Sequence, residues 1–318
     1  NYLVAGESEL QEMKNIKLQV PGTVANLVCG FDILGMALNE PFDEMEFKLL
    51  DERKIIIHHE DEFHLPTEPE KNVAGVVLLK ILEKLENQNI GFEVTINKKI
   101  KPGSGLGSSA ASAAGAAFGA NELLGNIFSK EELVYFAMFG EELASGSRHA
   151  DNIAPCLFGG ITLVKSSEPM DIIPLSSPDL YVSAVHPQVE VKTSDARQIL
   201  KKNIQMKDAV KQWGNVAGLV AGILKNDNQL ISRSLEDVLV EPVRSILIPK
   251  FDELKQKSIE LGALGGGISG SGPSIFMLSE TKEIAEKVAE IMQKIYNEIG
   301  IENYVYVSKI NDQGIRIV

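Results

Sequence analysis

The sequence is poor in cysteine and in positive charge. Of 318 residues only Cys29 and Cys156 are cysteines, and their spacing suits neither a disulfide framework nor a metal site. Lys and Arg number 31 against 44 Asp and Glu, for a formal net charge of −13. Nucleic-acid binding needs clustered basic residues, so no nucleic-acid partner is expected. The scarcity of cysteine is typical of a protein of the reducing cytoplasm.

Long apolar runs are missing as well. No segment approaches the roughly 20 consecutive apolar residues of a transmembrane helix, so no membrane partner is expected. The first dozen residues lack the positively charged start of a signal peptide. Strand-like patterning begins only after Met13, and we expect residues 1–12 to be an extension or a cloning remnant outside the fold. The composition, 44% hydrophobic and 24% charged, is typical of a globular protein.

Strand and helix patterns are mixed along the chain without strict alternation, which favours an α+β fold. A proline- and serine-rich stretch at residues 165–179 is typical of a loop, and we place a boundary there between domains at 13–165 and 166–318. Residues 43–50 and 54–60 are expected to pair as a hairpin.

Helix starts are also visible in the sequence. Asn72 is a plausible cap for the apolar helix that follows it, and we also weigh a contact with a nucleotide. Ser129 with Glu132 forms a capping-box pattern for a later helix.

The stretch KPGSGLGSSAASAAGAAFGANELLG at residues 101–125 sets glycines and serines ahead of an alanine-rich helix. It fails the P-loop and the dinucleotide-binding patterns, because Ser108 stands where the first needs lysine and the second needs glycine. Gly103, Gly105 and Gly107 still allow a tight turn with exposed N–H groups ahead of a helix N-terminus. The pattern predicts a phosphate site, against the alternative of a flexible turn before an ordinary helix.

Three ordered segments then indicate a family. PGSGLGSSAAS (102–112) resembles the central motif of the GHMP small-molecule kinases, such as the galactokinases and mevalonate kinases. PGTVANLVCGFDILGMAL (21–38) is similar to that family's N-terminal motif, and GGGISGSGPSIFML (265–278) to its C-terminal motif. The resemblance implies a first domain like ribosomal protein S5 domain 2, a second, ferredoxin-like domain, and ATP bound in the cleft between them.

The resemblance also assigns the ATP site. The residues it implies are Asn72, Pro102, Gly103, Ser104, Gly105, Leu106, Gly107, Ser108, Ser109, Ala110, Ala111 and Ser112. It assigns Mg²⁺ to Glu141 with Ser108, and Glu142 is a rival for that role.

Within the family, further segments resemble the members that phosphorylate homoserine. These are ELASGSRHADNIAPCLFGG (142–160), TSDARQILKK (193–202) and EPVRSILIP (241–249). The implied reaction is transfer of phosphate from ATP to the side-chain hydroxyl of L-homoserine, a step toward threonine. Arg197 and Arg244 would hold the carboxylate, since a guanidinium fork matches its geometry, and Asp32 would hold the ammonium group.

The remaining implied roles concern the hydroxyl end. Asn26, His149 and Asn152 would contact the substrate there, and Thr193 would cap a helix or touch the substrate, the cap being the commoner role. Asn152, His149, Glu141 and Thr193 make up the implied catalytic set. No general base is obvious, and the resemblance implies transfer by positioning and transition-state stabilisation, with Asp151 as the counter-hypothesis.

The first motif departs from the family pattern at two places, and two rival functions stay open. At one of these places Gly22 and Val24 stand near the usual Ala and Ser. Val28 and Cys29 replace a Gly-Pro pair of the first motif, and valine disfavours positive φ angles, so the local turn is expected to differ. The rival functions are another GHMP kinase acting on an alcohol such as mevalonate, or an inactive nucleotide-binding relative. The paired arginines with Asp32 favour an amino acid. A homodimer is compatible with the family.

Overall fold

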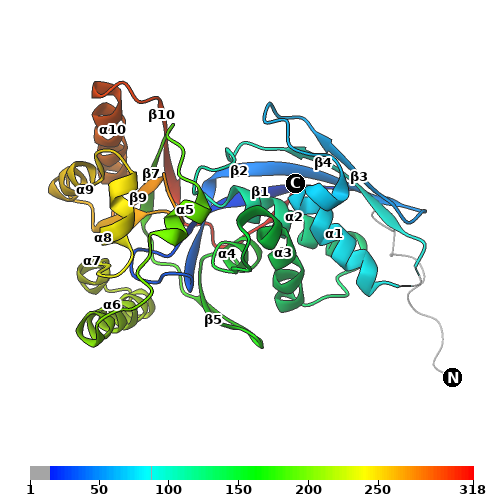
Figure 1. Ribbon diagram of the computed structural model, residues 1–318, viewed down its shortest axis with the longest axis horizontal. Helices are drawn as coiled ribbons and strands as arrows, with labels where there is room; N and C mark the ends of the chain where they lie inside the picture. Colours follow the sequence, from blue (N-terminus) through cyan, green and yellow to red (C-terminus); the bar gives the residue numbers. More distant parts are fainter. Residues whose placement is uncertain (1–14, 87) are drawn as a thin grey trace.

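The computed structural model describes residues 15–86 and 88–318. They form two sheets with helices packed on each, which divide the molecule into the right and left halves of Figure 1. The predicted extension at residues 1–12 lies outside the described residues. Among those described, no helix has the length and apolar character that a membrane crossing requires.

The first sheet has seven strands, and its main path runs β11-β1-β2-β4-β3, with β5 paired to β2 and β6 paired to β5. Their bounds are β1 (Asn15–Ala25), β2 (Leu34–Leu50), β3 (Ile55–His59), β4 (Gly91–Asn97), β5 (Ile161–Ser167), β6 (Met170–Leu175) and β11 (Arg316–Ile317). Burial alternates at the start of β1 and in the later part of β2, as expected when one face of a sheet packs on helices, whereas the end of β1 and the start of β2 are buried throughout.

Helices cover one face of this sheet (Figure 1). They are α1 (Val73–Lys84), α2 (Ser108–Leu123), α3 (Lys130–Ser145) and α4 (Ile153–Phe158), with the short 3-10 turn η1 (Pro69–Lys71) ahead of α1. Ser129 and Glu132 make the predicted capping box of α3, and Asn72 caps α1 through bonds from the N–H groups of Ala74 and Gly75. Helix α2 is buried on nearly all sides, which its small residues allow.

Two local expectations were wrong. The strands at β2 and β3 do not form a hairpin, because β4 lies between them and pairs antiparallel with β2 and parallel with β3. The stretch at residues 165–179 is not a loop throughout, since Met170–Leu175 forms β6 and pairs with β5. Proline is tolerated there because β6 lies at the margin of the sheet.

The second sheet has four antiparallel strands in the order β10-β7-β9-β8. The strands are β7 (Tyr181–Pro187), β8 (Gly265–Ile268), β9 (Ile275–Ser279) and β10 (Asn303–Lys309). The helices are α5 (Thr193–Gln198), α6 (Met206–Lys225), α7 (Asn228–Ser234), α8 (Glu241–Arg244), α9 (Phe251–Glu260) and α10 (Lys282–Glu298), with η2 (Ser245–Leu247). Numbered from β7, the strand order is 4-1-3-2 with helices in both crossovers, which is the ferredoxin-like arrangement.

The two halves share much of their core. On β7, Val182 and Ala184 join the large cluster that fills the first domain, while Val185 joins a second cluster with α9 and α10. This follows from the two-residue alternation of a strand. The α+β, two-domain prediction is confirmed.

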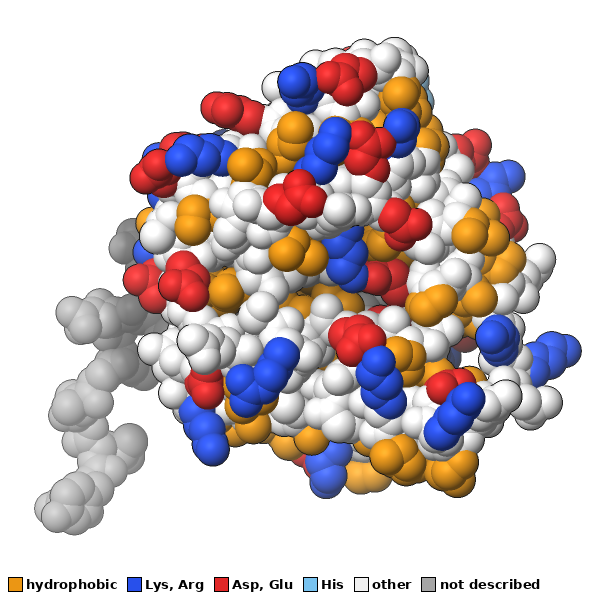
Figure 2. Space-filling view, turned by 90° about the vertical axis from the view of Figure 1, so that its left-hand side faces the viewer, with side chains coloured by type: hydrophobic (Ala, Val, Ile, Leu, Met, Phe, Trp, Pro, Cys, Tyr) orange, Lys and Arg blue, Asp and Glu red, His pale blue; other side chains and the backbone are white. Residues whose placement is uncertain are grey.

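The surface of the second domain is mixed in charge. Figure 2 shows acidic and basic side chains interspersed over the end of the molecule that carries α6, α9 and α10 in Figure 1. Met206, Val210 and Trp213 of α6 are more than half exposed.

Candidate active site

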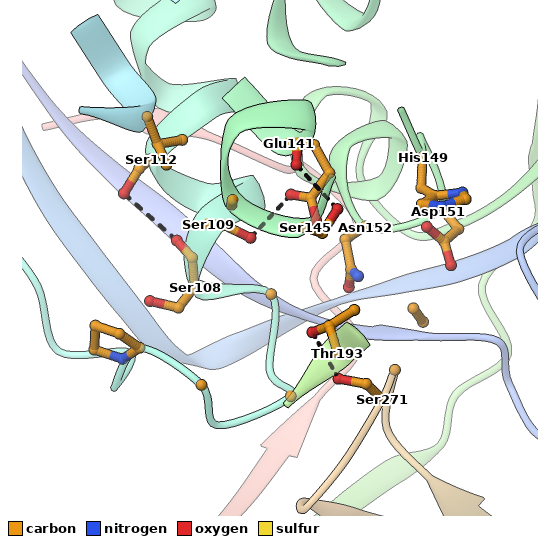
Figure 3. A pocket seen from close by; sticks show the side chains of 18 of the residues that line it. Ser108, Ser109, Ser112, Glu141, Ser145, His149, Asp151, Asn152, Thr193 and Ser271 are labelled. Atoms are coloured by element: carbon orange, nitrogen blue, oxygen red, sulfur yellow. Dashed lines mark hydrogen bonds between the residues drawn. The ribbon is translucent and has the colours of Figure 1, made fainter. Parts of the chain in front are cut away.

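A cavity of about 360 Å³ lies where the two domains meet, and all three motifs contribute to its lining. We call one part of it the loop end, which is lined by Asn72, Pro102, Gly103, Gly105, Gly107, Ser108 and Ser109. The part lined by Asp32, Arg197 and Arg244 is the arginine end. Figure 3 shows side chains that line this cavity, among them Ser109, Glu141 and Asn152.

The loop end is a turn built on glycines. Gly103, Gly105 and Gly107 have φ angles of 77°, 81° and 72°, which residues other than glycine rarely adopt. Gly107 stands at the N-cap of α2 and offers no side chain to bond its first N–H groups. The first turn of α2 therefore has free donors at the positive end of the helix dipole, as an anion site requires.

The C-terminal motif clamps this turn from outside. The Ser269 hydroxyl donates to the Gly105 carbonyl at 2.7 Å, and the Ser274 N–H donates to the Ser104 carbonyl at 3.2 Å. A Cβ added at Gly105 would lie 2.7 Å from the carbonyl oxygens of Ser269 and Gly272. The two glycine-rich motifs thus fold against each other.

A buried ion pair supports the turn from below. Lys98 Nζ donates to Asp43 Oδ2 at 2.5 Å and to the Ser108 carbonyl and the Ser112 hydroxyl at 3.0 Å each. Asp43 Oδ1 accepts from the N–H groups of Lys99 and Ile100. The side chains of Lys98 and Asp43 are 2% and 0% exposed. Sequence reasoning missed both, and no motif marked them.

The side chain of Asn72 uses both of its polar atoms. Its Oδ1 caps α1, and its Nδ2 donates to the Pro66 carbonyl at 2.7 Å and lies 3.0 Å from His59 Nε2. Asn72, His59 and Pro66 all line the cavity, so the cap and a contact with a bound molecule are compatible. His59 Nδ1 lies 3.1 Å from Asp61 Oδ2.

The first motif adopts the turn that its valine was expected to alter. Asn26, Leu27, Val28 and Asp32 all have positive φ angles, of 73°, 42°, 68° and 61°. A β-branched residue in this region is strained, and such strain concentrates at functional sites. The turn brings Asn26 Oδ1 to the Asp32 N–H at 3.0 Å and Asn26 Nδ2 to the Gly270 carbonyl at 3.0 Å.

Glu141 is bonded to a different serine from the one predicted. Ser109 Oγ donates to Glu141 Oε2 at 2.9 Å (Figure 3), while the Ser108 hydroxyl donates to the Ile100 carbonyl at 2.7 Å. Burial raises the pKa of Glu141, against the bond from Ser109. Glu142 instead pairs with Arg148 at 2.8 Å on the exposed side of α3.

Oxygen ligands are thus available for a divalent cation, but only a few. Among residues 15–86 and 88–318, no group of three or more His, Cys, Asp or Glu is placed to hold a metal ion. One desolvated carboxylate beside serine hydroxyls and a phosphate turn fits Mg²⁺ held jointly by protein and phosphates, and does not fit a dedicated metal cage.

Asn152 forms part of the cavity wall. Its Oδ1 accepts from the Thr23 hydroxyl at 2.7 Å, and a Cβ added at Gly107 would lie 2.0 Å from that hydroxyl. Thr23 therefore fixes the Asn152 amide against the loop. Thr23 lies within the first motif, but neither composition nor spacing indicated this role.

Two titratable neighbours flank Asn152. Asp151 is buried, and that burial raises its pKa to about 7, with the charges of Asp32 and Glu141 adding to the rise. Burial lowers the pKa of His149, against the attraction of Asp32, so the imidazole is neutral at neutral pH. Its Nδ1 lies 3.8 Å from Asp32 Oδ2.

At the arginine end, side chains from three distant segments meet. Arg197 Nη1 and Nη2 donate to Asp32 Oδ2 and Oδ1 at 3.2 and 2.9 Å. Arg244 Nε donates to the Ala196 carbonyl at 2.8 Å, and its guanidinium lies 5.0 Å from the centre of the Phe31 ring. Burial, with the charge of Arg197 adding, lowers the pKa of Arg244 to about 10, so it stays charged at neutral pH.

Thr193 does not cap α5. Lys192 is the N-cap residue, with no side-chain cap bond, and the Thr193 hydroxyl lies 3.2 Å from that of Ser271 (Figure 3). Both line the cavity, which leaves a contact with the substrate as the remaining predicted role of Thr193. Ser271 and Gly270 belong to the C-terminal motif, whose resemblance was the signal that could have placed them in the site.

Comparison with known proteins identifies the class. The chain matches the GHMP kinases N terminal domain over residues 72–160 and the GHMP kinases C terminal domain over residues 219–298. It is 46% identical to a homoserine kinase of Chloroherpeton thalassium, over 96% of this chain and 100% of that protein. The crystal structure of homoserine kinase from Cytophaga hutchinsonii has a TM-score of 0.91 at 47% identity and covers 100% of both chains.

These matches show that the chain belongs to the GHMP kinase family, in its homoserine kinase branch. The family predicted from the three motifs is thus confirmed. The L. major mevalonate kinase, solved with R-mevalonate, has a TM-score of 0.69 at 14% identity over 92% of this chain, a likeness of fold alone.

Proposed function

We propose that this protein transfers the γ-phosphoryl group of ATP to the side-chain hydroxyl of L-homoserine. One observation carries the proposal: a phosphate-type turn and a pocket with two guanidinium groups and one carboxylate share a single cavity. An amino acid carries one carboxylate and one ammonium group, which are the charges these side chains complement. Mevalonate has no ammonium group for Asp32, so that alternative is not favoured.

The loop end would hold the triphosphate. Backbone N–H groups at the start of α2 face the cavity, and no lysine of the turn itself is needed for charge. The roles of Asn72 and of residues 102–112 in ATP binding stay predictions.

Mg²⁺ would be held by Glu141 with a serine hydroxyl, and when bound it would neutralise charge on the phosphates. Ser109 is the serine bonded to Glu141, whereas Ser108 is the one that the family resemblance implies. Comparing Ser108→Ala with Ser109→Ala decides between them. We expect Ser109→Ala to raise the Mg²⁺ concentration needed for half-maximal rate several-fold, by the loss of one oxygen ligand. A rise with Ser108→Ala alone would restore the prediction from the sequence.

Positioning would supply most of the catalysis. Phosphoryl transfer requires little covalent chemistry from a protein. Binding aligns the reactants before they react, so the entropy cost of alignment no longer adds to the barrier, and this alone accelerates the reaction greatly. Asn26, His149 and Asn152 would hold the hydroxyl, and an amide cannot remove its proton. Asp151 is the nearest counter-candidate for a base, and its pKa of about 7 would suit that task.

Two substitutions separate these mechanisms. If positioning suffices, Asp151→Asn retains turnover within about tenfold, while Asn152→Ala loses more than that because the hydroxyl is misplaced. A collapse with Asp151→Asn beside a mild effect of Asn152→Ala would make Asp151 the base.

The function itself is tested by ADP release from MgATP with homoserine, mevalonate, galactose or no acceptor. We expect release that depends on homoserine. Release without any acceptor, or none with any, would overturn the proposal and favour an unspecific ATPase or an inactive relative. Location in the cytoplasm and a homodimer stay predictions, the second measurable by sedimentation.

A further inference from the structure

The two groups assigned to opposite charges of the substrate are bonded to each other. Arg197 and Asp32 form a two-point ion pair, with N–O distances of 2.9 and 3.2 Å. Both side chains are 28% exposed, so the pair is open to the cavity and not sealed in the core. A bound zwitterion that takes the same oxygens of Asp32 and the same Nη groups of Arg197 has to separate this pair.

The backbone of Asp32 has little freedom to move. It has a φ of 61°, and its N–H donates to Asn26 Oδ1 at 3.0 Å. Arg197 is less constrained, because it lies on the short helix α5 and its Nε is buried without a hydrogen-bond partner among the described residues. We therefore expect Arg197, and not the backbone of Asp32, to move when the pair separates.

Arg244 differs from Arg197 in its exposure and in its bonding partners. It is 3% exposed, and among the described residues its guanidinium donates to the backbone carbonyls of Ala196 and Gly270 alone. Its charge is thus bonded to neutral groups and stands beside the Phe31 ring. At the arginine end, Arg244 is bonded to neutral groups, whereas Arg197 is bonded to the carboxylate of Asp32.

We infer that the Asp32–Arg197 pair is an exchangeable pair that selects for zwitterions. The inference rests on the proposed function, since it takes homoserine as the acceptor. The substrate carboxylate joins Arg244 and replaces Asp32 as the partner of Arg197, while the substrate ammonium replaces Arg197 as the partner of Asp32. One internal ion pair becomes two pairs with the ligand, and no charge is left unpaired.

A ligand with one charge cannot complete this exchange. A carboxylate without an ammonium group must either leave Asp32 unpaired or bind through Arg244 alone. An amine without a carboxylate must leave Arg197 unpaired. An unpaired charge in a partly desolvated site is costly, so the pair discriminates against both kinds of analogue.

The test uses two fragments of homoserine, 4-hydroxybutanoate and 3-aminopropan-1-ol, with dissociation constants measured by calorimetry or by competition with homoserine. Asp32→Asn frees Arg197, so this variant should bind 4-hydroxybutanoate about fivefold more tightly than the unaltered protein, the effect expected of one partly exposed pair. Arg197→Gln frees Asp32 and should bind 3-aminopropan-1-ol more tightly by a similar factor. Both variants should bind homoserine more weakly.

Removal of a like charge can tighten a fragment without any exchange, so the double variant decides. If Asp32 competes for Arg197, Asp32→Asn tightens 4-hydroxybutanoate only while Arg197 is present, whereas plain charge repulsion gives the same tightening in the Arg197→Gln background. Equal tightening in both backgrounds, or unchanged affinity in the single variants, overturns the inference. Asp171→Asn is the matched control, because Asp171 pairs with Lys165 at 2.7 Å on the exposed hairpin of β5 and β6. It should change no dissociation constant.

Two further readouts keep the outcomes separate. The unfolding temperature of each variant shows whether it folds, and the two variants give independent arms, since each frees a different partner. Turnover of homoserine by the unaltered protein tests the proposed function directly. Turnover with unchanged fragment affinities overturns only the exchange, whereas no turnover overturns the function.

Discussion

The two ends of the cavity are built from different materials. The loop end is made of backbone groups on glycines, clamped by Ser269 and supported by the buried Lys98–Asp43 pair. The arginine end is made of charged side chains from three separate segments, two of which bond each other. The difference indicates that the shape of the loop end depends on folding, while the arginine end can be altered with the fold intact.

The largest effect is expected from Asp43→Ala. It leaves the ammonium group of Lys98 buried without its partner, and breaking a buried pair typically costs about 3–5 kcal/mol of unfolding free energy. Urea unfolding measures this loss. The control is Asp171→Ala, which removes an exposed pair and should leave the unfolding midpoint unchanged. Equal midpoints for both variants would contradict the dependence of the loop end on folding.

Gly105→Val should combine two losses. The substitution alters a glycine of the predicted ATP turn, and the φ of 81° at Gly105 and the carbonyls 2.7 Å from an added Cβ make it a folding defect as well. We expect no ATP binding and a fall of several degrees in the unfolding temperature, since left-handed backbone alone costs about 1–2 kcal/mol. Gly103→Val is matched in φ, but no atom lies within 4 Å of its added Cβ, so its fall should be smaller.

Arg244→Gln tests the other end. We expect kcat/KM for homoserine to fall on the order of 100-fold through loss of a carboxylate contact, with KM for ATP changed less than about twofold. Steady-state kinetics in both substrates measures this. Equal losses for homoserine and ATP would mean that the two ends are not separable.

The smallest effect is a dependence of stability on pH. Because the pKa of Asp151 is raised to about 7 from its ordinary value of 3.8, the folded protein binds this proton more tightly than the unfolded chain does. The protonated Asp151 therefore favours the folded state fully at a pH below its pKa in the unfolded chain, and this stabilisation is lost as the pH rises through about 7. Asp151→Asn should therefore raise the unfolding temperature at pH 8 by roughly 2–4 °C and less at pH 5. A pH-independent change would contradict the buried, shifted carboxyl.

The sequence predicted the family and the fold because its motifs are local. PGSGLGSSAAS carries its glycines in order, and the positive φ angles that they allow are properties of single residues. The caps at Asn72 and Ser129 were predicted for the same reason. Thr193 was weighed as a cap and is not one, because the hydroxyl has a tertiary neighbour in Ser271.

Pairing between distant segments was beyond sequence reasoning. The hairpin prediction was wrong because β4 lies between β2 and β3 in the sheet. Residues 43–60 contain no signal for a partner strand that begins only at Gly91. Lys98 and Asp43 were missed because either alone is an ordinary surface charge in the sequence. Ser109 and Ser108 are indistinguishable in the motif until the first turn of α2 sets their directions.

The class of chemistry followed from residue types in order along the chain: a glycine turn for phosphate, then arginines and a carboxylate for an amino acid. Which atoms meet was decided by the tertiary structure. Asp32 and Arg197 are 165 positions apart and form a pair only because the first motif and α5 are folded against one cavity. Local backbone preference acts within a few residues, whereas burial and charge pairing act between whatever segments packing brings together.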